Sequence, residues 1–190
     1  YVIILCFGAF LVLIQFNLLT IILGLSSMLL AFSYPFMKRI TYWPQLFLGI
    51  TFNWGIIMAW AAINNSLNAE IIILYLSAIF WTLGYDTVYG AQDMSDDELI
   101  GLKSTSIKFK KNMRLFISTS YLISIILIIF LFRNFIGINI FTFFLMIFIL
   151  SLVYQLLALK QSRSKNFLKI FKFNNYTGFL LFISIFSMNL

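Results

Sequence analysis

Charged side chains are scarce in this chain, and histidine is absent. Only 10% of the 190 residues are charged, whereas 62% are apolar. A soluble domain normally carries about a quarter of its residues as charged side chains, which keep its surface in water. The composition therefore excludes an ordinary soluble domain and favours a chain that folds in a lipid bilayer.

Cysteine is nearly absent too. The single cysteine, Cys6, lies in an apolar run, where we expect it to pack. With one thiol and no histidine, the chain cannot build a disulfide framework, a Cys/His zinc site or a Cys-His nucleophile. Any bound metal ion must be held by oxygen, which favours Mg²⁺, Mn²⁺ or Ca²⁺.

The apolar residues fall in long runs, and a helix of about 20 such residues crosses a hydrocarbon core of about 30 Å. We expect spanning helices at 1–16, 18–37, 44–63, 71–90, 115–132, 138–159 and 174–190. The run from Tyr1 to Ile14 would rise only about 21 Å, so we expect sequence upstream of Tyr1. The predicted fold is all-α, a polytopic transmembrane helical bundle forming a single domain over 1–190 that is incomplete at its N-terminus.

Basic residues gather in the loops that follow the second, fourth and sixth predicted spans. They are Lys38, Arg39, Lys103, Lys108, Lys110, Lys111, Arg114, Lys160, Arg163, Lys165, Lys169 and Lys172, and the opposite loops hold only Arg133. Because basic residues in short loops resist translocation, we expect these three loops in the cytoplasm and the C-terminus outside. For most of the 160–172 group, topology signalling and lipid headgroup contact are a sufficient explanation.

Acidic residues are concentrated in one place. Of the 6 in the chain, all but Glu70 lie between 86 and 98. A carboxylate at the centre of a membrane helix costs about 2.5 to 3.5 kcal/mol, so such residues usually face a cavity or an interface and have a task. If the fourth helix continued past the membrane boundary, Asp86, Asp93 and Asp97 would lie within about 40° of one another. Mg²⁺ suits such a stripe, whereas the alternative is a solvated acidic loop paired with nearby lysines.

Two basic segments accompany the acidic cluster. Lys103, Ser104 and Thr105 follow it, while Lys38 and Arg39 end the second span. Metal ions on one side and Lys, Ser and Thr donors on the other can hold a diphosphate. For Lys38 and Arg39, a pure topology signal is the alternative.

Aromatic residues make up 19% of the chain, and we expect most of the 23 Phe to face lipid or to pack. Five Tyr and Trp residues lie in segments near the charged motifs, where π faces can stabilise a developing cation. They are Tyr34, Trp54, Trp81, Tyr85 and Tyr89. Asn53, near the middle of the third span, is expected to form an interhelical hydrogen bond rather than contact a substrate.

Three ordered motifs carry a resemblance to a known family. Residues 85–97 (YDTVYGAQDMSDD) and 101–105 (GLKST) resemble the second aspartate-rich motif of the UbiA superfamily of intramembrane prenyltransferases, in its 4-hydroxybenzoate polyprenyltransferase branch. Residues 34–39 (YPFMKR) with Pro44 and Gln45 resemble that branch's YxxxK segment, and 174–178 (NNYTG) resemble its C-terminal helix.

The resemblance implies about nine helices around a central cavity, of which this chain would hold the last seven. It implies a Mg²⁺-dependent enzyme of ubiquinone biosynthesis, which transfers a polyprenyl group from polyprenyl diphosphate to 4-hydroxybenzoate, ortho to the hydroxyl. The family's first aspartate motif, NDxxDxxxD, does not occur in these residues. We therefore expect residues 1–190 alone to be inactive.

The resemblance also assigns site residues. The catalytic carboxylates would be Asp93, Asp97 and Asp86, with Asp93 and Asp97 as the metal ligands and Asp86 as a polar neighbour. Contacts to the diphosphate or to the aromatic acid would come from Lys38, Arg39, Lys103, Tyr34 and Tyr89.

Two other functions are consistent with these features. One is a sister enzyme acting on homogentisate, dihydroxynaphthoate or haem. The other is a divalent-cation transporter, although a transport path should carry acidic groups through several spans. The expected partners are the two substrates and the lipid bilayer, with no nucleic acid and no obligate protein partner. We expect a bacterial inner membrane rather than the mitochondrial one.

Overall fold

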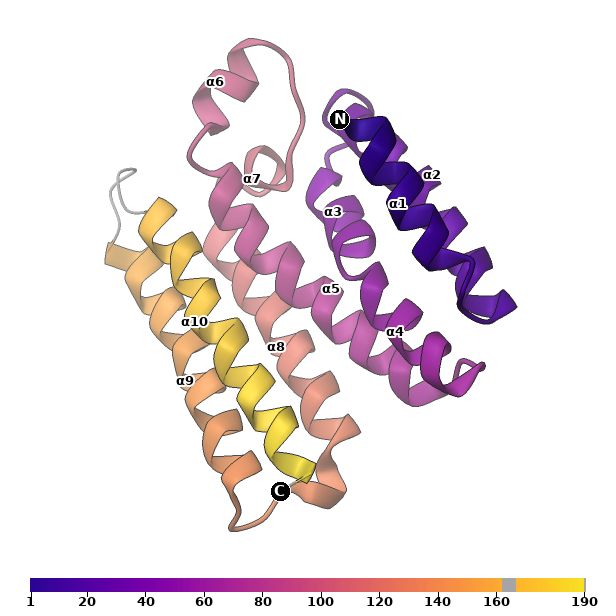
Figure 1. Ribbon diagram of the computed structural model, residues 1–190. Helices are drawn as coiled ribbons and strands as arrows, with labels where there is room; N and C mark the ends of the chain where they lie inside the picture. Colours follow the sequence, from indigo (N-terminus) through magenta and orange to yellow (C-terminus); the bar gives the residue numbers. More distant parts are fainter. Residues whose placement is uncertain (162–166, 190) are drawn as a thin grey trace.

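The computed structural model describes residues 1–161 and 167–189, and within these ranges it contains helices and no strands (Figure 1). The prediction of an all-α helical bundle is confirmed. The long helices are α1 (Val2–Leu13), α2 (Leu18–Ile40), α3 (Pro44–Phe52), α4 (Trp54–Asn64), α5 (Ala69–Gly90), α8 (Met113–Leu131), α9 (Ile140–Gln161) and α10 (Phe167–Phe186). Shorter elements are α6 (Met94–Leu99), α7 (Thr105–Lys108), η1 (Arg133–Phe135) and η3 (Ser187–Asn189).

Each apolar run of the sequence is helical. Among the described residues, 5 segments are long and apolar enough to cross a membrane: α2, α3 with α4, α5, α8, and α9 as far as Leu159. The helix α1 is shorter, with 12 residues. The last helix begins at Phe167 rather than at 174. It can include Lys169 and Lys172, because both are exposed and long basic side chains can reach water from a helix end.

The third span was predicted as one continuous helix, but the structure divides it into two. Asn53 has φ −89° and ψ 3°, and it separates α3 from α4. Its Nδ2 donates hydrogen bonds to the Gly49 carbonyl and to Thr82 Oγ1, both at 2.8 Å. The predicted interhelical bond is therefore confirmed. The Asn53 side chain gives the Gly49 carbonyl a second partner, besides the Asn53 N–H at 3.3 Å.

Successive spans alternate in direction, so that the ends of α2, α5 and α9 lie at the same end of the bundle, together with α6 and α7 (Figure 1). The C-terminus lies at the other end. Lys38, Lys103 and Lys108 therefore share one end of the molecule, as the charge pattern predicts. Arg163 and Lys165 lie outside the described residues, and the cytoplasmic orientation stays a prediction.

The helix α5 is the centre of the bundle, where it packs against α3, α4, α8 and α10. Tyr121 of α8 and Phe148 and Leu152 of α9 are almost fully buried beside it. At Gly84 the close approach of α8 leaves no room for a side chain, because a Cβ there would lie 2.4 Å from Tyr121 Cε1. The absence of a Cβ at Gly84 thus allows α5 and α8 to pack this closely.

We expect Gly84→Ala to lower the melting temperature of the protein in detergent. Overpacking against an immobile ring costs about 1 to 3 kcal/mol, against a helix-propensity gain of at most about 1 kcal/mol. Gly55→Ala in α4 is the matched control, since a Cβ at that position meets nothing within 4 Å. The control should melt at or above the wild-type temperature, and equal melting of both variants would contradict the proposed close contact.

Candidate active site

The acidic cluster lies where α5 ends. The helix stops at Gly90 and the chain turns, so that Asp93 becomes the residue before α6 and Asp97 lies in its first turn. The prediction that Asp86, Asp93 and Asp97 form one stripe on a continuous helix is therefore wrong. Asp96 and Asp97 favour a new helix start instead, because the positive end of the helix dipole stabilises carboxylates there.

The end of α6 returns the chain to α2. Gly101 has φ +75°, a left-handed conformation that favours glycine, and the Leu102 N–H donates to the Asp97 carbonyl at 2.8 Å. The Lys103 N–H then donates to the Lys38 carbonyl at 2.8 Å. The turn thus brings the two basic segments side by side.

A cavity of about 240 Å³ opens between the ends of α2 and α5, and we call it the charged cavity. Its lining comprises Tyr34, Lys38, Pro44, Gln45, Leu48, Asp86, Tyr89, Gly90, Asp93 and Phe171. Asp86 is 8% exposed, whereas Asp93 is exposed. Five of the predicted site residues therefore meet at one cavity, from segments far apart in the sequence.

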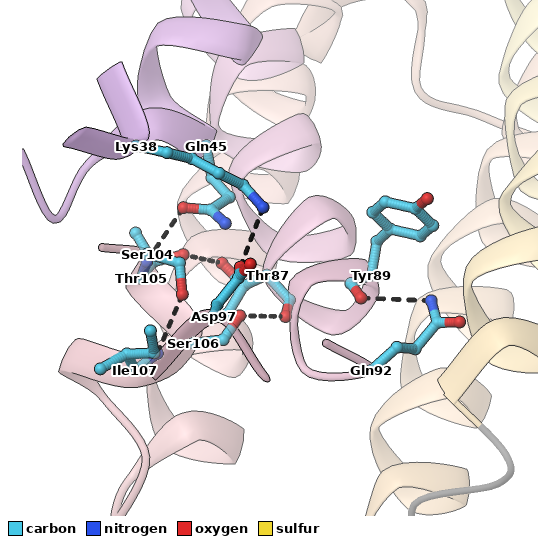
Figure 2. Close-up of polar contacts among 10 residues, drawn as sticks. All are labelled: Lys38, Gln45, Thr87, Tyr89, Gln92, Asp97, Ser104, Thr105, Ser106 and Ile107. Atoms are coloured by element: carbon cyan, nitrogen blue, oxygen red, sulfur yellow. Dashed lines mark hydrogen bonds and ion pairs between the residues drawn. The ribbon is translucent and has the colours of Figure 1, made fainter. Parts of the chain in front are cut away.

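An ion pair closes one side of this region (Figure 2). Lys38 Nζ lies 2.9 Å from Asp97 Oδ2, and the two side chains are 39% and 9% exposed. Lys110 and Glu98 form a second pair at 2.6 Å, which is exposed. Asp97 and Glu98 therefore fit the alternative explanation, an acidic loop paired with nearby lysines. Asp86 and Asp93 do not, because they form no ion pair within the described residues.

The hydroxyls of the segment 104–106 have partners inside the protein, whereas the sequence suggested that those of Ser104 and Thr105 bind a diphosphate. Ser104, Thr105 and Ser106 are all 0% exposed. Thr105 Oγ1 lies 2.7 Å from Thr87 Oγ1, and Ser106 Oγ donates to the Thr87 carbonyl at 2.7 Å (Figure 2). This segment fastens α7 to α5.

Gln45 completes the fastening, and sequence reasoning missed this role. Its Oε1 accepts a hydrogen bond from the Thr105 N–H at 2.9 Å, and the side chain is 3% exposed. A glutamine next to the proline that begins a membrane helix was the available signal, because an amide in that position needs a partner.

Two of the predicted substrate contacts do not line the charged cavity. Lys103 Nζ donates to the Ile40 carbonyl at 3.2 Å and lies 5.6 Å from the centre of the Tyr42 ring. Arg39 is exposed at the end of α2. Their role in substrate binding stays a prediction.

A second cavity of about 350 Å³, the aromatic cavity, adjoins the first, because Phe171 lines both. Its walls include Asn53, Trp81, Tyr85 and Asn174. Of the aromatic residues singled out in the sequence, Trp54 lies elsewhere and donates to the Leu23 carbonyl at 2.9 Å.

A third cavity of about 270 Å³, the apolar cavity, follows the aromatic one. Asn53, Trp81 and Gly178 line both. The remaining walls of the apolar cavity are mostly aliphatic and include Ile56 and Leu74. The three cavities thus follow α5 from its charged end towards the middle of the bundle.

The described residues contain no group of three Asp, Glu, Cys or His side chains close enough to hold a metal ion. Asp86 and Asp93 face one cavity, while Asp97 is held by Lys38. Mg²⁺ typically binds through one or two carboxylates together with water and substrate phosphates. The residues present therefore fit a metal ion that binds with a phosphate-bearing ligand, and the assignment of Asp93 and Asp97 as its ligands stays a prediction.

Comparison with known proteins identifies the family. Residues 1–184 match the UbiA prenyltransferase family. The chain belongs to this family. A UbiA homologue from Aeropyrum pernix K1 has the same fold, with a TM-score of 0.77 at 21% identity over 95% of this chain and 68% of that one.

Curated relatives of this UbiA-family chain carry a more specific name. The mitochondrial 4-hydroxybenzoate polyprenyltransferase of Arabidopsis thaliana is 49% identical over 108 residues, which are 56% of this chain and 26% of that protein. The proteins of the same name from Bos taurus and Homo sapiens are each 51% identical over 108 residues, with 29% of each covered. The matched stretch is thus less than a third of these relatives.

We expect Lys38→Met to destabilise the protein, because it leaves the carboxylate of Asp97 buried without its partner. The loss should be roughly 1 kcal/mol or more, between the values for exposed and fully buried pairs. Adding Asp97→Asn should restore part of it, since the double variant removes both charges. Thermal unfolding in detergent measures each step.

Lys110→Met is the matched control, because it breaks the exposed pair with Glu98. It should change the free energy of unfolding by at most about 0.5 kcal/mol. A Lys38 variant as stable as this control would mean that the buried pair contributes nothing.

Proposed function

We propose that this chain is part of an enzyme that transfers a polyprenyl group from polyprenyl diphosphate to 4-hydroxybenzoate in ubiquinone biosynthesis. The observation that carries the proposal is the order of the cavities, since a charged cavity, an aromatic cavity and an apolar cavity adjoin along α5. A polyprenyl diphosphate has the same order of chemistry, from an anionic head through an allylic carbon to an apolar tail. The names of the relatives support 4-hydroxybenzoate as the acceptor.

The diphosphate belongs in the charged cavity. Lys38 supplies the cation there, and Tyr34 and Tyr89 border the same space. Mg²⁺ would be held by Asp93 and Asp97, with Asp86 as a polar neighbour, and when bound it would stabilise the charge on the leaving diphosphate as a Lewis acid. The apolar tail then extends along the aliphatic walls of the apolar cavity, out of contact with water.

The chain's own residues support the reaction in three ways. Lys38 stabilises the diphosphate as the allylic C–O bond breaks and its electron pair passes to oxygen. The aromatic walls around Trp81 and Tyr85 exclude water from the carbon that becomes electron-poor. A ring carbon of 4-hydroxybenzoate, ortho to the hydroxyl, then forms the new C–C bond, and the proton on that carbon leaves to restore aromaticity.

The protein is a multi-pass membrane protein of the UbiA family. The relatives are named as mitochondrial proteins, which speaks against the expectation of a bacterial inner membrane. Our proposal is therefore a membrane in which ubiquinone is made, with the charged cavity at the end of the bundle that bears the basic loops.

We expect Asp93→Asn to reduce prenyl transfer strongly and the double variant Asp93→Asn with Asp97→Asn to abolish it. Asp93 would act by holding the metal ion, and loss of one group that stabilises developing negative charge typically costs about 10² to 10³ in rate. Asp93 is the cleaner test, because it is exposed and forms no ion pair among the described residues. The assay is product formation in membranes containing the full gene product.

The control is Asp96→Asn, an exposed neighbour that does not line the charged cavity. It should retain nearly wild-type turnover. Near-normal turnover of the double variant would end the assignment of these carboxylates.

The proposed function is tested by offering the full gene product a radiolabelled polyprenyl diphosphate with each acceptor in turn. Label should appear in prenylated 4-hydroxybenzoate, and not in products of homogentisate, dihydroxynaphthoate or haem. Chelation with EDTA should stop the reaction, and added Mg²⁺ should restore it, since the diphosphate needs a counter-charge to leave. Transfer to another acceptor alone would refute the substrate assignment, and full activity in EDTA would refute the metal.

A further inference from the structure

A buried hydrogen-bond network joins four helices behind the aromatic cavity. The amides of Asn174 (α10) and Gln155 (α9) pair with each other, with Asn174 Nδ2 3.1 Å from Gln155 Oε1 and Gln155 Nε2 3.3 Å from Asn174 Oδ1. Tyr121 (α8) donates to Gln155 Oε1 at 3.0 Å, and Gln155 Nε2 also donates to Thr177 Oγ1 at 3.0 Å. A fully paired network of this kind holds its members in one arrangement.

The network reaches the aromatic cavity at Asn174, which is part of its wall, and at Trp81 (α5) beside it. The indole Nε1–H donates to Asn174 Oδ1 at 3.1 Å. The ring meets Phe148 and Tyr85 edge to face, with centroid distances of 5.7 Å and 5.8 Å. A Cβ on Gly178 would lie 3.1 Å from Trp81 Cη2, so the ring also rests on the backbone of α10. The indole is therefore held at its Nε1–H, at its contacts with Phe148 and Tyr85, and at Cη2.

The position of this ring is critical, because Trp81 lines both the aromatic and the apolar cavity. It therefore stands at the boundary between the charged end of the site and the apolar end. The face of an indole attracts positive charge more strongly than any other aromatic side chain. A ring that is free to rotate would offer that face only part of the time.

We propose that Asn174 is a positioning residue. Through its hydrogen bond to Nε1–H it fixes the indole of Trp81 against the allylic end of the prenyl donor, so that the electron-poor carbon meets the aromatic acceptor and not water. The inference rests on the proposed function and adds to it a residue and a role.

The chemistry offers a direct readout, because two nucleophiles compete for the same carbon. In both outcomes the C–O bond breaks and its electron pair passes to the diphosphate. Attack by the acceptor ring forms a C–C bond and releases the ring proton, whereas attack by water forms a C–O bond and releases a proton from water, which gives prenyl alcohol. The ratio of prenylated acid to prenyl alcohol reports the geometry around the carbon, independently of how much folded enzyme is present.

The test compares Asn174→Leu, Trp81→Phe and the double variant in the full gene product. Each single variant should lower kcat for transfer by about tenfold to a hundredfold, the usual cost of a misplaced reacting group. Each should also raise the share of prenyl alcohol. Because both substitutions remove the same hydrogen bond, the double variant should be no worse than the poorer single variant.

Ser184→Ala is the matched control. Ser184 is a fully buried residue of α10 whose Oγ donates to the Phe141 carbonyl at 2.9 Å, and it lies outside the three cavities. It should keep the wild-type product ratio even if the protein melts at a lower temperature. Trp81→Phe guards against misfolding of the Asn174 variant, since it leaves the amide pair intact.

An active wild type whose Asn174→Leu variant keeps the wild-type product ratio would overturn the inference and leave the proposed function standing. Multiplicative losses of kcat in the double variant would do the same. A wild-type protein that prenylates none of the acceptors would overturn the proposed function, and this inference with it.

Discussion

A lipid bilayer offers no hydrogen-bond partner to a polar group, and the structure depends on that constraint throughout. Where α3 ends at Asn53, the polar side chain of that residue donates to the Gly49 carbonyl of α3 and to the Thr82 hydroxyl on α5. Where the Thr105 N–H is buried, Gln45 accepts it. Among the described residues, only Trp60 Nε1 and Ser124 Oγ are buried side-chain atoms without a partner. The buried polar residues of this apolar chain therefore serve largely to hydrogen-bond its helices to one another.

The same constraint explains what could be predicted from the sequence. Five of the seven predicted spans match segments of the described residues that are long and apolar enough to cross a membrane. The charged cavity follows from carboxylates and lysines that no lipid-facing position tolerates. Asp86, Asp93 and Lys38 were singled out for that reason, and the structure brings them to one cavity. Such predictions succeed because the energetic cost of a misplaced charge is large compared with any local preference.

What could not be predicted depends on three-dimensional partners. The sequence allows α5 to continue past Gly90, but the helix ends there. Ser106 and Gln45, both distant in sequence, pack so closely around this glycine that a Cβ would lie 2.9 Å from an atom of each. The hydroxyls of Ser104 and Thr105 look like ligand donors until their internal partners are known. Asn174 begins one of the three motifs, but its role could not be predicted, because that role depends on Trp81, 93 positions away in the chain.

The arrangement of all three cavities along α5 sets the length over which a bound molecule would extend. Residues at 86, 81 and 74 contribute successively to the charged, aromatic and apolar cavities. From Asp86 to Leu74 a straight helix rises about 18 Å. For the proposed prenyl donor to contact all three cavities, its diphosphate and the start of its tail would therefore have to extend at least that distance along α5.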